Sequence, residues 1–228
     1  MKFVEYADSE MMAIDVANVL VGELGAVLRH QDRALLVVPG GSTPGPIFDS
    51  LCAANLDWGR VDVLLSDERW HPEEHPRSNM RLIRERLLLG RAAAANLLPL
   101  YRKDRTPAEA APQLSGRIAG HLPISVMLLG MGADMHTASL FPGAPGLEAA
   151  LDRHAPILVP VEMPADMAGA SEPRISLSAA VMNGAMSKHI VIIGAEKRRA
   201  IEAAGSLPPL EAPVAAILAD TVVHWADA

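Results

Sequence analysis

Five largely apolar runs recur along the chain, each about as long as a buried β-strand. They cover residues 34–38, 61–65, 124–129, 189–193 and 214–218. Because the runs are continuous rather than alternating, we expect strands covered on both faces. Helix-like patterns separate them, and this alternation predicts an α/β fold: a mainly parallel, Rossmann-like open sheet with helices on both faces.

Helical spacing marks the intervals between the runs. Leu20, Leu24 and Leu28 belong to an apolar stripe that predicts a core-facing helix over residues 8–29. Further helices are expected after Pro44, over residues 78–89, before Gly120 with a start delayed by Pro112, and over residues 178–186. Residues 97–100 suit an extra strand and residues 160–173 a loop near the site. With no repeat or clear linker, residues 1–228 are expected to form a single α/β domain.

Polar and glycine-rich segments follow three of the predicted strands. The first strand runs into Pro39-Gly-Gly-Ser-Thr-Pro-Gly45, where the glycines allow a close backbone approach and Thr43-Pro44 suits a helix N-cap and first helical position. A helix N-terminus favours an anion, so Gly41, Ser42 and Thr43 are candidate phosphate ligands. A plain strand-to-helix turn explains the same residues equally well.

The second strand ends in Ser66-Asp-Glu-Arg-Trp70. Asp67 and Arg69 are candidate site residues there, and a surface salt bridge is the simpler explanation of each charge alone. Residue types that can bind a metal follow: His71, Glu73, Glu74 and His75. Because Pro72 and Pro76 indicate an irregular loop without a firm third ligand, a metal site is not expected.

The third segment carries the most candidate chemistry. Four apolar residues from Val126 run into Gly130-Met-Gly132, and Asp134, His136, Thr137 and Ser139 follow within six residues. In an open α/β sheet, ligands bind beyond the carboxyl ends of the strands, so we expect the reaction to occur here. Ser139 and His136 lack a nucleophile elbow, which disfavours a covalent Ser–His mechanism.

Composition limits the possible partners. The formal net charge of −7 and the absence of basic clusters argue against nucleic acid, although a small phosphorylated ligand needs only two or three cations. The single cysteine, Cys52, excludes an internal disulfide and fits a reducing cytosol. No apolar run approaches 18 residues, and the N-terminus lacks the pattern of a signal peptide, so we expect a cytoplasmic protein that does not span a membrane.

The ordered set of motifs resembles the 6-phosphogluconolactonase family, within a superfamily that also contains glucosamine-6-phosphate isomerase. The matching segments are Gly40-Gly-Ser-Thr-Pro44, Ser66-Asp-Glu-Arg69 with Ser78-Asn79, Leu129 to Gly143, Pro173-Arg-Ile-Ser176 and Gly194-x-x-Lys197. Arg69, where the isomerase typically has tyrosine, and Thr137-Ala-Ser-Leu-Phe-Pro142 favour the lactonase. The resemblance therefore implies one lactonase-like domain.

The resemblance implies hydrolysis of 6-phospho-D-glucono-1,5-lactone to 6-phosphogluconate, without a cofactor or metal. His136 is the candidate general base, because an imidazole titrates near working pH, and Asp134 is the candidate orienting group. Arg69 is a candidate for stabilising negative charge or binding substrate. The resemblance puts the substrate phosphate near the Gly41-Ser42-Thr43 turn, Arg174 and Lys197.

One departure from the family pattern keeps alternatives open. The family usually has Asp-Gly-His, whereas this chain has Asp134-Met135-His136, which is strained if that position needs a positive φ. A sugar-phosphate isomerase is the nearest alternative enzyme. A sensor that binds sugar phosphates without turnover is the other alternative. The sequence does not indicate the oligomeric state.

Overall fold

A parallel sheet forms the centre of the computed structural model, which describes residues 1–163 and 172–228. Its seven strands lie in the order β1-β10-β9-β6-β2-β3-β5, and every neighbouring pair is parallel. Their bounds are β1 (Lys2–Tyr6), β2 (Ala34–Val38), β3 (Val61–Leu65), β5 (Asn96–Leu98), β6 (Val126–Gly130), β9 (Lys188–Ile193) and β10 (Thr221–Ala226). The mainly parallel α/β fold predicted from the sequence is confirmed.

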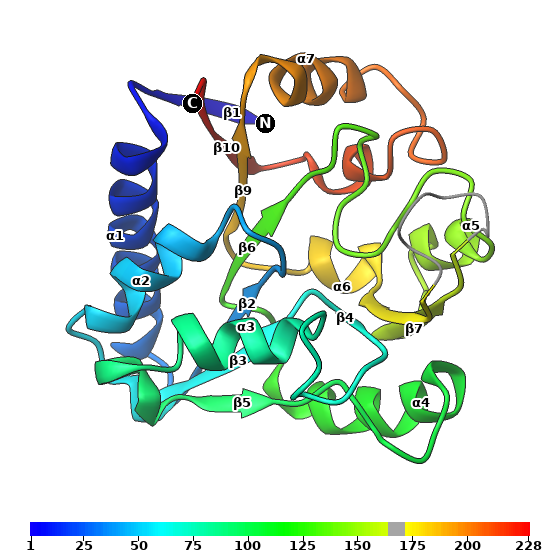
Figure 1. Cartoon of the computed structure of the whole chain (residues 1–228), viewed down its shortest axis with the longest axis horizontal. Coiled ribbons are helices and arrows are strands. Elements are labelled where there is room, and N and C mark those ends of the chain that lie inside the picture. The colour runs from blue at the N-terminus through cyan, green and yellow to red at the C-terminus, as the bar shows by residue number, and fades with distance from the viewer. Residues whose placement is uncertain (164–171) are drawn as a thin grey trace.

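Helices surround this sheet, with α1 and α2 on the left and α6 on the right in Figure 1. The helices are α1 (Ser9–Leu28), α2 (Gly45–Ala53), α3 (Asn79–Arg86), α4 (Pro107–Ile118), α5 (Leu147–Leu151), α6 (Ala179–Asn183) and α7 (Ala195–Ala204). Buried apolar side chains of the helices and strands form a continuous core cluster. The sheet and its covering helices thus share one hydrophobic interior.

Helix α1 shows how the apolar pattern specifies an element. Asp8 caps its N-terminus by accepting a hydrogen bond from the backbone N–H of Met11, and Leu20, Leu24 and Leu28 are buried against the core. The helix is also long and apolar enough to cross a membrane by length and composition. Its packing against α2 and the sheet identifies it as a core helix.

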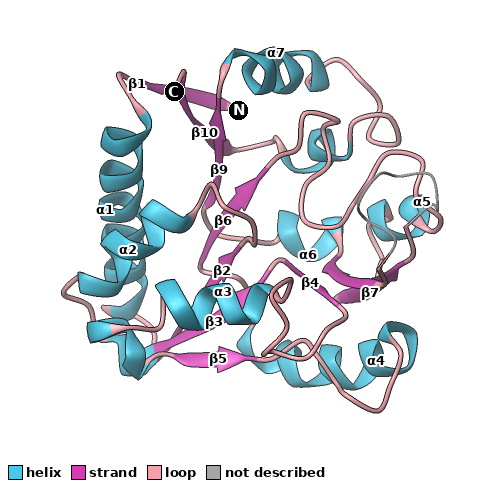
Figure 2. Ribbon diagram, in the orientation of Figure 1, coloured by secondary structure: helices cyan, strands magenta, loops and turns pink. Residues whose placement is uncertain are grey.

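A second, smaller sheet lies beside the first, and Figure 2 shows two of its strands, β4 and β7, to the right of β2 and β3. It contains β4 (Asp67–Arg69), β8 (Arg174–Leu177) and β7 (Leu158–Val161), all antiparallel. Its register pairs Arg69 with Arg174 and Asp67 with Ser176. This pairing brings two distant segments of the chain to the same place, which the sequence alone did not reveal.

Two predicted elements near the C-terminus and the middle of the chain are wrong. Residues 214–218 are not a strand, because Pro213 begins a short 3-10 helix (Pro213–Ile217) and the last strand is β10. Pro112 does not delay α4: a capping box formed by Thr106 and Glu109 starts the helix at Pro107. Pro112 and Ala108 are both exposed, so water can solvate the carbonyl that lacks an N–H partner.

Other boundaries moved by a few residues. Helix α2 begins at Gly45 with Pro44 as its N-cap, so Thr43 is not the cap. Helix α3 ends at Arg86 rather than near Leu89, and α6 covers less than the predicted 178–186. The predicted loop at 160–173 is interrupted at its start by β7, which includes Pro160; residues 164–171 of that loop lie outside the described residues.

Candidate active site

A cavity of about 270 Å³ lies where β2, β6 and β9 reach their carboxyl ends. Every residue proposed for the site from the sequence lines it except Asp134, which lies behind His136. The lining set includes Gly41, Ser42, Thr43, Asp67, Arg69, His136, Arg174 and Lys197. The topology therefore brings together segments that are far apart along the chain, at the position where open α/β sheets bind ligands.

The glycine-rich turn after β2 forms one wall. Gly41 has φ of 86°, a conformation that side chains rarely adopt. Gly40 has no room for a side chain, because an added Cβ would lie 2.1 Å from Oδ1 of Asn79. Helix α2 starts directly after the turn, and no side chain in the described part of the protein caps it, so the positive end of its dipole is available to an anion in the cavity.

The Asp134 carboxylate and the His136 imidazole form a close pair. Asp134 Oδ1 lies 2.5 Å from His136 Nδ1 and also accepts the backbone N–H of His136 at 3.2 Å. Burial alone would raise the pKa of Asp134, but the hydrogen bonds and charge interaction with His136 outweigh it and lower that pKa. An ionised Asp134 accepts from Nδ1–H, so the imidazole presents Nε2 as its proton acceptor.

Packing fixes the plane of this imidazole. The His136 ring stacks on Phe141 with 4.2 Å between ring centroids. Gly132 lies against both His136 and Asp134, since a Cβ there would be 2.3 Å from the His136 ring and 2.4 Å from Asp134 Oδ1. The imidazole is therefore positioned before any substrate arrives.

The turn that carries His136 is strained, as the replacement of the family's glycine suggested. Met135 has φ of 66°, a conformation that costs a non-glycine residue on the order of 1–3 kcal/mol. Hydrogen bonds hold it there: Met135 N–H donates to the Gly132 carbonyl at 3.0 Å, and the Met135 carbonyl accepts from Val214 N–H at 3.1 Å. Met135 also packs against the core, which further holds the turn in this conformation.

Asp67 is bound to two serine hydroxyls. Ser139 Oγ donates to Asp67 Oδ2 at 2.6 Å, and Ser66 Oγ donates to Oδ1 at 3.1 Å. Ser139 is fully buried, and its hydroxyl is directed to Asp67 rather than to His136. This geometry argues against a Ser139–His136 nucleophilic pair, in line with the reading of the sequence.

Two arginines that line the cavity each have an unused donor. Nε of Arg69 and Nε of Arg174 are both buried, and neither has a hydrogen-bond partner among residues 1–163 and 172–228. Arg174 is held loosely, with Nη1 3.9 Å from Asp67 Oδ2 and Nη2 3.6 Å from Glu172 Oε1. Burial lowers the pKa of Arg174, against the opposing charge of Asp67. Buried donors without partners are costly, and a ligand oxygen would satisfy them.

Lys197 supplies a third cation. It lies in the first turn of α7, is half-buried and lines the cavity, and Gly194 before it has φ of 92°. No carboxylate within the described residues forms an ion pair with it, unlike its neighbour Arg198, which pairs with Glu5 at 2.6 Å. A lysine at the positive end of a helix is otherwise unfavourable, and an anion in the cavity would offset that cost.

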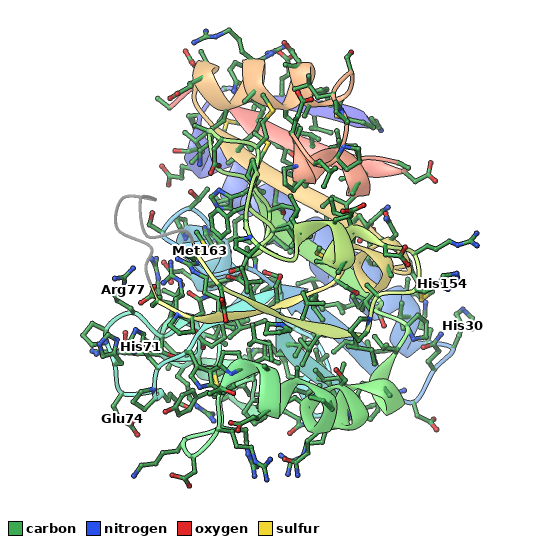
Figure 3. All side chains as sticks on the ribbon, turned by 90° about the vertical axis from the view of Figure 1, so that its right-hand side faces the viewer. His30, His71, Glu74, Arg77, His154 and Met163 are labelled. Atoms are coloured by element: carbon green, nitrogen blue, oxygen red, sulfur yellow. The ribbon has the colours of Figure 1, made fainter. Side chains whose placement is uncertain are left out.

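The loop after β4 contains the histidines considered as metal ligands. His71 Nε2 lies 2.8 Å from Glu172 Oε2, and the His71 and His75 rings stack at 3.9 Å. Glu74 extends from the same loop toward the edge of the molecule (Figure 3). Within residues 1–163 and 172–228, no three such side chains are grouped to hold a metal ion.

Several contacts at the site were not predicted. Met131, Ala138 and Val191 line the cavity, but apolar residues near strand ends give no signal in a sequence. The Ser139–Asp67 hydrogen bond joins residues 72 positions apart, so only the fold reveals it. Asn79 also lines the cavity, and the sequence marked it only as part of a motif.

Comparisons with known proteins identify the family of the chain. The model of the family described as glucosamine-6-phosphate isomerases/6-phosphogluconolactonase matches residues 7–225. A 6-phosphogluconolactonase of Pseudomonas aeruginosa is 38% identical over 223 residues, covering 92% of this chain and 88% of the relative. A 6-phosphogluconolactonase of Rhizobium meliloti is 39% identical over 224 residues, covering 96% and 94%.

Solved structures of related proteins share the fold. A 6-phosphogluconolactonase from Shewanella baltica OS155 superposes with a TM-score of 0.93 at 30% identity, over 99% of this chain and 97% of that one. A monomeric glucosamine-6-phosphate deaminase superposes with a TM-score of 0.82 at 14% identity, which shows a shared fold and nothing further. The fold is thus common to two chemistries, and the site has to distinguish them.

Proposed function

Because the chain belongs to the glucosamine-6-phosphate isomerase/6-phosphogluconolactonase family, we propose that it hydrolyses 6-phospho-D-glucono-1,5-lactone to 6-phospho-D-gluconate. This reaction is a step of the oxidative pentose phosphate pathway. The observation that carries the proposal is the Asp134–His136 pair at 2.5 Å beside two guanidinium groups with unused buried donors. A base that activates water and cations that stabilise an oxyanion are what lactone hydrolysis requires.

The phosphate is proposed to bind at the glycine-rich turn. Gly41, Ser42 and Thr43 precede the uncapped N-terminus of α2, and Arg174 and Lys197 approach the same cavity. A dianion gains from both the helix dipole and the two cations. Binding the phosphate there orients the lactone ring toward His136, which converts the attack of water into an event within one complex.

Nε2 of His136 is proposed to start the hydrolysis. Nε2 takes a proton from a water molecule as the water oxygen bonds to the lactone carbonyl carbon. The carbonyl oxygen becomes an oxyanion, which Arg69 is placed to stabilise, and Asp134 stabilises the imidazolium. Collapse breaks the bond between that carbon and the ring oxygen, and the imidazolium returns its proton to the departing ring oxygen.

Asp67 is proposed to position Arg174 as well as to bind the substrate. Its carboxylate is held by Ser139 and Ser66 and lies 3.9 Å from Arg174 Nη1. Its charge is proposed to attract Arg174 toward the cavity, and its remaining lone pairs can accept a substrate hydroxyl.

The isomerase alternative is less well supported. Isomerisation moves a proton between two carbons, and the glutamate that the isomerases use beyond their histidine has no counterpart here. Phe141 and Pro142 occupy that stretch, and the Phe141 ring packs against His136. The sensor alternative rests on the strain at Met135, yet the Asp134–His136 pair is intact.

The whole chain is proposed to act as one domain in the cytoplasm, without nucleic acid or a membrane as partner. The continuous core cluster and the net charge of −7 support this proposal. The phosphorylated lactone is the expected partner. The residues that form the site need no cofactor for the proposed steps.

The deciding experiment measures lactone hydrolysis directly. The lactone is generated in place and its loss is followed with purified protein, against a control without protein, because the lactone also hydrolyses spontaneously. EDTA is present throughout. Acceleration that survives EDTA supports a metal-independent lactonase and shows that Met135 is tolerated. Sugar-phosphate binding without acceleration would overturn the proposal in favour of a sensor.

A further inference from the structure

Glu68 lies between two residues that line the cavity but does not line it itself. It is the middle residue of β4, flanked by Asp67 and Arg69, and its exposed fraction is 0%. Successive side chains of a strand point to opposite faces, so Glu68 points away from the cavity while its neighbours face it. A fully buried carboxylate is costly unless its oxygens are hydrogen-bonded, which makes its partners informative.

The partners of Glu68 come mainly from the first turn of α3. Its carboxylate accepts the backbone N–H of Asn79 at 2.7 Å, that of Met80 at 2.8 Å and the Ser78 hydroxyl at 3.2 Å. It also accepts the backbone N–H of Arg69 at 2.8 Å. The carboxylate thus joins the N-terminus of a helix to a strand, where the helix dipole favours a negative charge.

The helix turn held in this way reaches the cavity through Asn79. The Asn79 side chain donates to the Asp67 carbonyl at 3.0 Å and lines the cavity. The same side chain fills the space beside Gly40, where an added Cβ would lie 2.1 Å from Oδ1. Three parts of the cavity wall therefore meet around one anchor: the glycine-rich turn, β4 and the start of α3.

We infer that Glu68 is a positioning residue of the active site, which sets the places of Arg69 and Asn79 by binding β4 to the N-terminus of α3. This inference rests on the proposed function. The ionised carboxylate serves this purpose best, because all four partners donate and a protonated oxygen loses acceptor capacity. A displaced Asn79 would also release the wall at Gly40, so one lost anchor affects both substrate binding and oxyanion stabilisation.

Burial gives the anchor a pH dependence. It raises the pKa of Glu68 to about 7, with the charge of Asp67 in the same direction and the backbone N–H bonds opposed. Arg69 lies next to Glu68 on β4, Arg174 lies on the paired strand β8, and Arg81 extends from α3. The hydrogen bonds of Glu68 therefore weaken as the pH falls through the neutral range, and we expect the activity to fall with them. Protonation of a purely structural carboxylate elsewhere in the fold would not change the activity in this way.

The test replaces Glu68 by glutamine, which keeps the size but exchanges one acceptor for a donor that faces backbone N–H groups. Glu68→Gln is expected to lower kcat/KM by about tenfold or more, since each hydrogen bond to a charged group is strong. We expect the wild-type kcat/KM to fall from pH 8 to pH 6, in part because Glu68 takes up a proton, and Glu68→Gln should show a smaller fall. Asp62→Asn is the matched control: Asp62 is a buried carboxylate of β3 with three side-chain partners, away from the cavity.

If Glu68 is merely structural, Glu68→Gln lowers the thermal midpoint as Asp62→Asn does, but leaves kcat/KM unchanged at a temperature where both variants are folded. That result would overturn the inference. If Glu68→Gln does not fold, Ser78→Ala removes the longest of the four bonds, at 3.2 Å, together with the N-cap bond of α3 that Ser78 Oγ accepts from the Arg81 N–H. It is expected to lower kcat/KM about two- to fivefold. Thr106→Ala, which removes the comparable cap of α4, is expected to leave kcat/KM unchanged. An unchanged kcat/KM in Ser78→Ala would also contradict the inference.

Failure of the proposed function gives a different result. In that case the wild type itself shows no lactone hydrolysis, and the affinity for 6-phosphogluconate, measured by calorimetry, replaces kcat/KM as the readout. Weaker binding by Glu68→Gln than by the wild type and Asp62→Asn would then uphold the anchor. Equal binding by all three would overturn it.

Discussion

Asp134 Oδ1 lies 2.5 Å from Nδ1 of His136, and the same oxygen accepts the backbone N–H of His136. One carboxylate oxygen therefore sets both the backbone and the ring of the residue two positions later. Because the carboxylate can only accept, the proton of the neutral imidazole stays on Nδ1 and the lone pair on Nε2. The proposed mechanism depends on this tautomer.

The first prediction concerns this tautomer. Asp134→Asn is expected to lower kcat about 10²- to 10⁴-fold with a small change in KM, because the amide no longer stabilises the imidazolium and can donate to Nδ1. Asp152→Asn is the matched control, since Asp152 also accepts the backbone N–H two residues later but lies outside the cavity. Steady-state kinetics, corrected for spontaneous hydrolysis of the lactone, measures kcat and KM of both variants. Equal kcat values for the two variants would refute the role of Asp134.

The second prediction concerns the base itself. His136→Ala is expected to lower turnover by at least about 10²-fold while the affinity for 6-phosphogluconate stays within a few-fold of the wild type, since the proposed phosphate ligands are elsewhere. Calorimetry measures the affinity and the lactone assay the turnover. His154→Ala, at an exposed position away from the cavity, controls for loss of a histidine. Turnover like that of the wild type would exclude His136 as the general base.

The third prediction separates two cations that the sequence treated alike. Lys197→Ala and Arg174→Ala are both expected to raise KM by about tenfold or more, because each removes a charge from the proposed phosphate site. Only Arg174→Ala should also lower the thermal midpoint, since Arg174 is buried between Asp67 and Glu172 whereas Lys197 is half-buried.

Arg198→Ala provides the control for Lys197. Arg198 is the next residue along α7, but its guanidinium pairs with Glu5 and Glu202 and stacks over Trp225. Its loss is expected to leave KM unchanged. A KM that rises equally in Lys197→Ala and Arg198→Ala would point to general electrostatic attraction rather than to a phosphate ligand.

The fourth prediction concerns the space behind the imidazole. Gly132→Ala would put a Cβ 2.3 Å from the His136 ring and 2.4 Å from Asp134 Oδ1, so the pair must move. A displacement of about 1 Å at a catalytic group can cost about 10²-fold in rate, and we expect a loss of that order in kcat. Gly116→Ala, in α4 with open space at the Cβ position, is the control and should stabilise slightly. Full activity in Gly132→Ala would show that the packing does not fix His136.

The sequence predicted the parts of the fold whose information is local. β2 is apolar throughout and β3 is interrupted only by Asp62, and both strands are buried on both faces, so their runs were recognised. β10 was missed because His224 and Trp225 interrupt its apolar pattern. His224 is tolerated inside since it contacts His189 at 3.0 Å and the Tyr6 hydroxyl at 2.8 Å, and those residues are distant in sequence.

The same distinction applies to the site. Asp134 and His136 are two residues apart, so the sequence alone indicated their pairing. The Glu68 anchor and the Ser139–Asp67 bond depend on how β4 pairs with β8 and meets α3, which a single sequence does not display. Charges at strand ends could be proposed as ligands, but the partners that orient them required the tertiary structure.

The last prediction tests pH-dependent stability at Asp62, on the opposite edge of the sheet from the cavity. Burial would raise its pKa, but hydrogen bonds from Arg33, Asn96 and His121 outweigh that effect and lower the pKa from 3.8 to about 2. A group whose pKa is lower in the folded than in the unfolded state stabilises the protein at pH values above its unfolded-state pKa. This stabilisation is lost as the pH falls through the folded-state pKa.

The shift corresponds to about 2 kcal/mol of stability at neutral pH. Asp62→Asn should therefore lower the free energy of unfolding in urea by about that amount at pH 7, and the gap from the wild type should narrow as pH falls from 4 toward 2. Taking the difference between the two proteins removes the contribution of the other carboxylates. A gap that stays constant over this range would show that Asp62 acts through packing rather than through its charge.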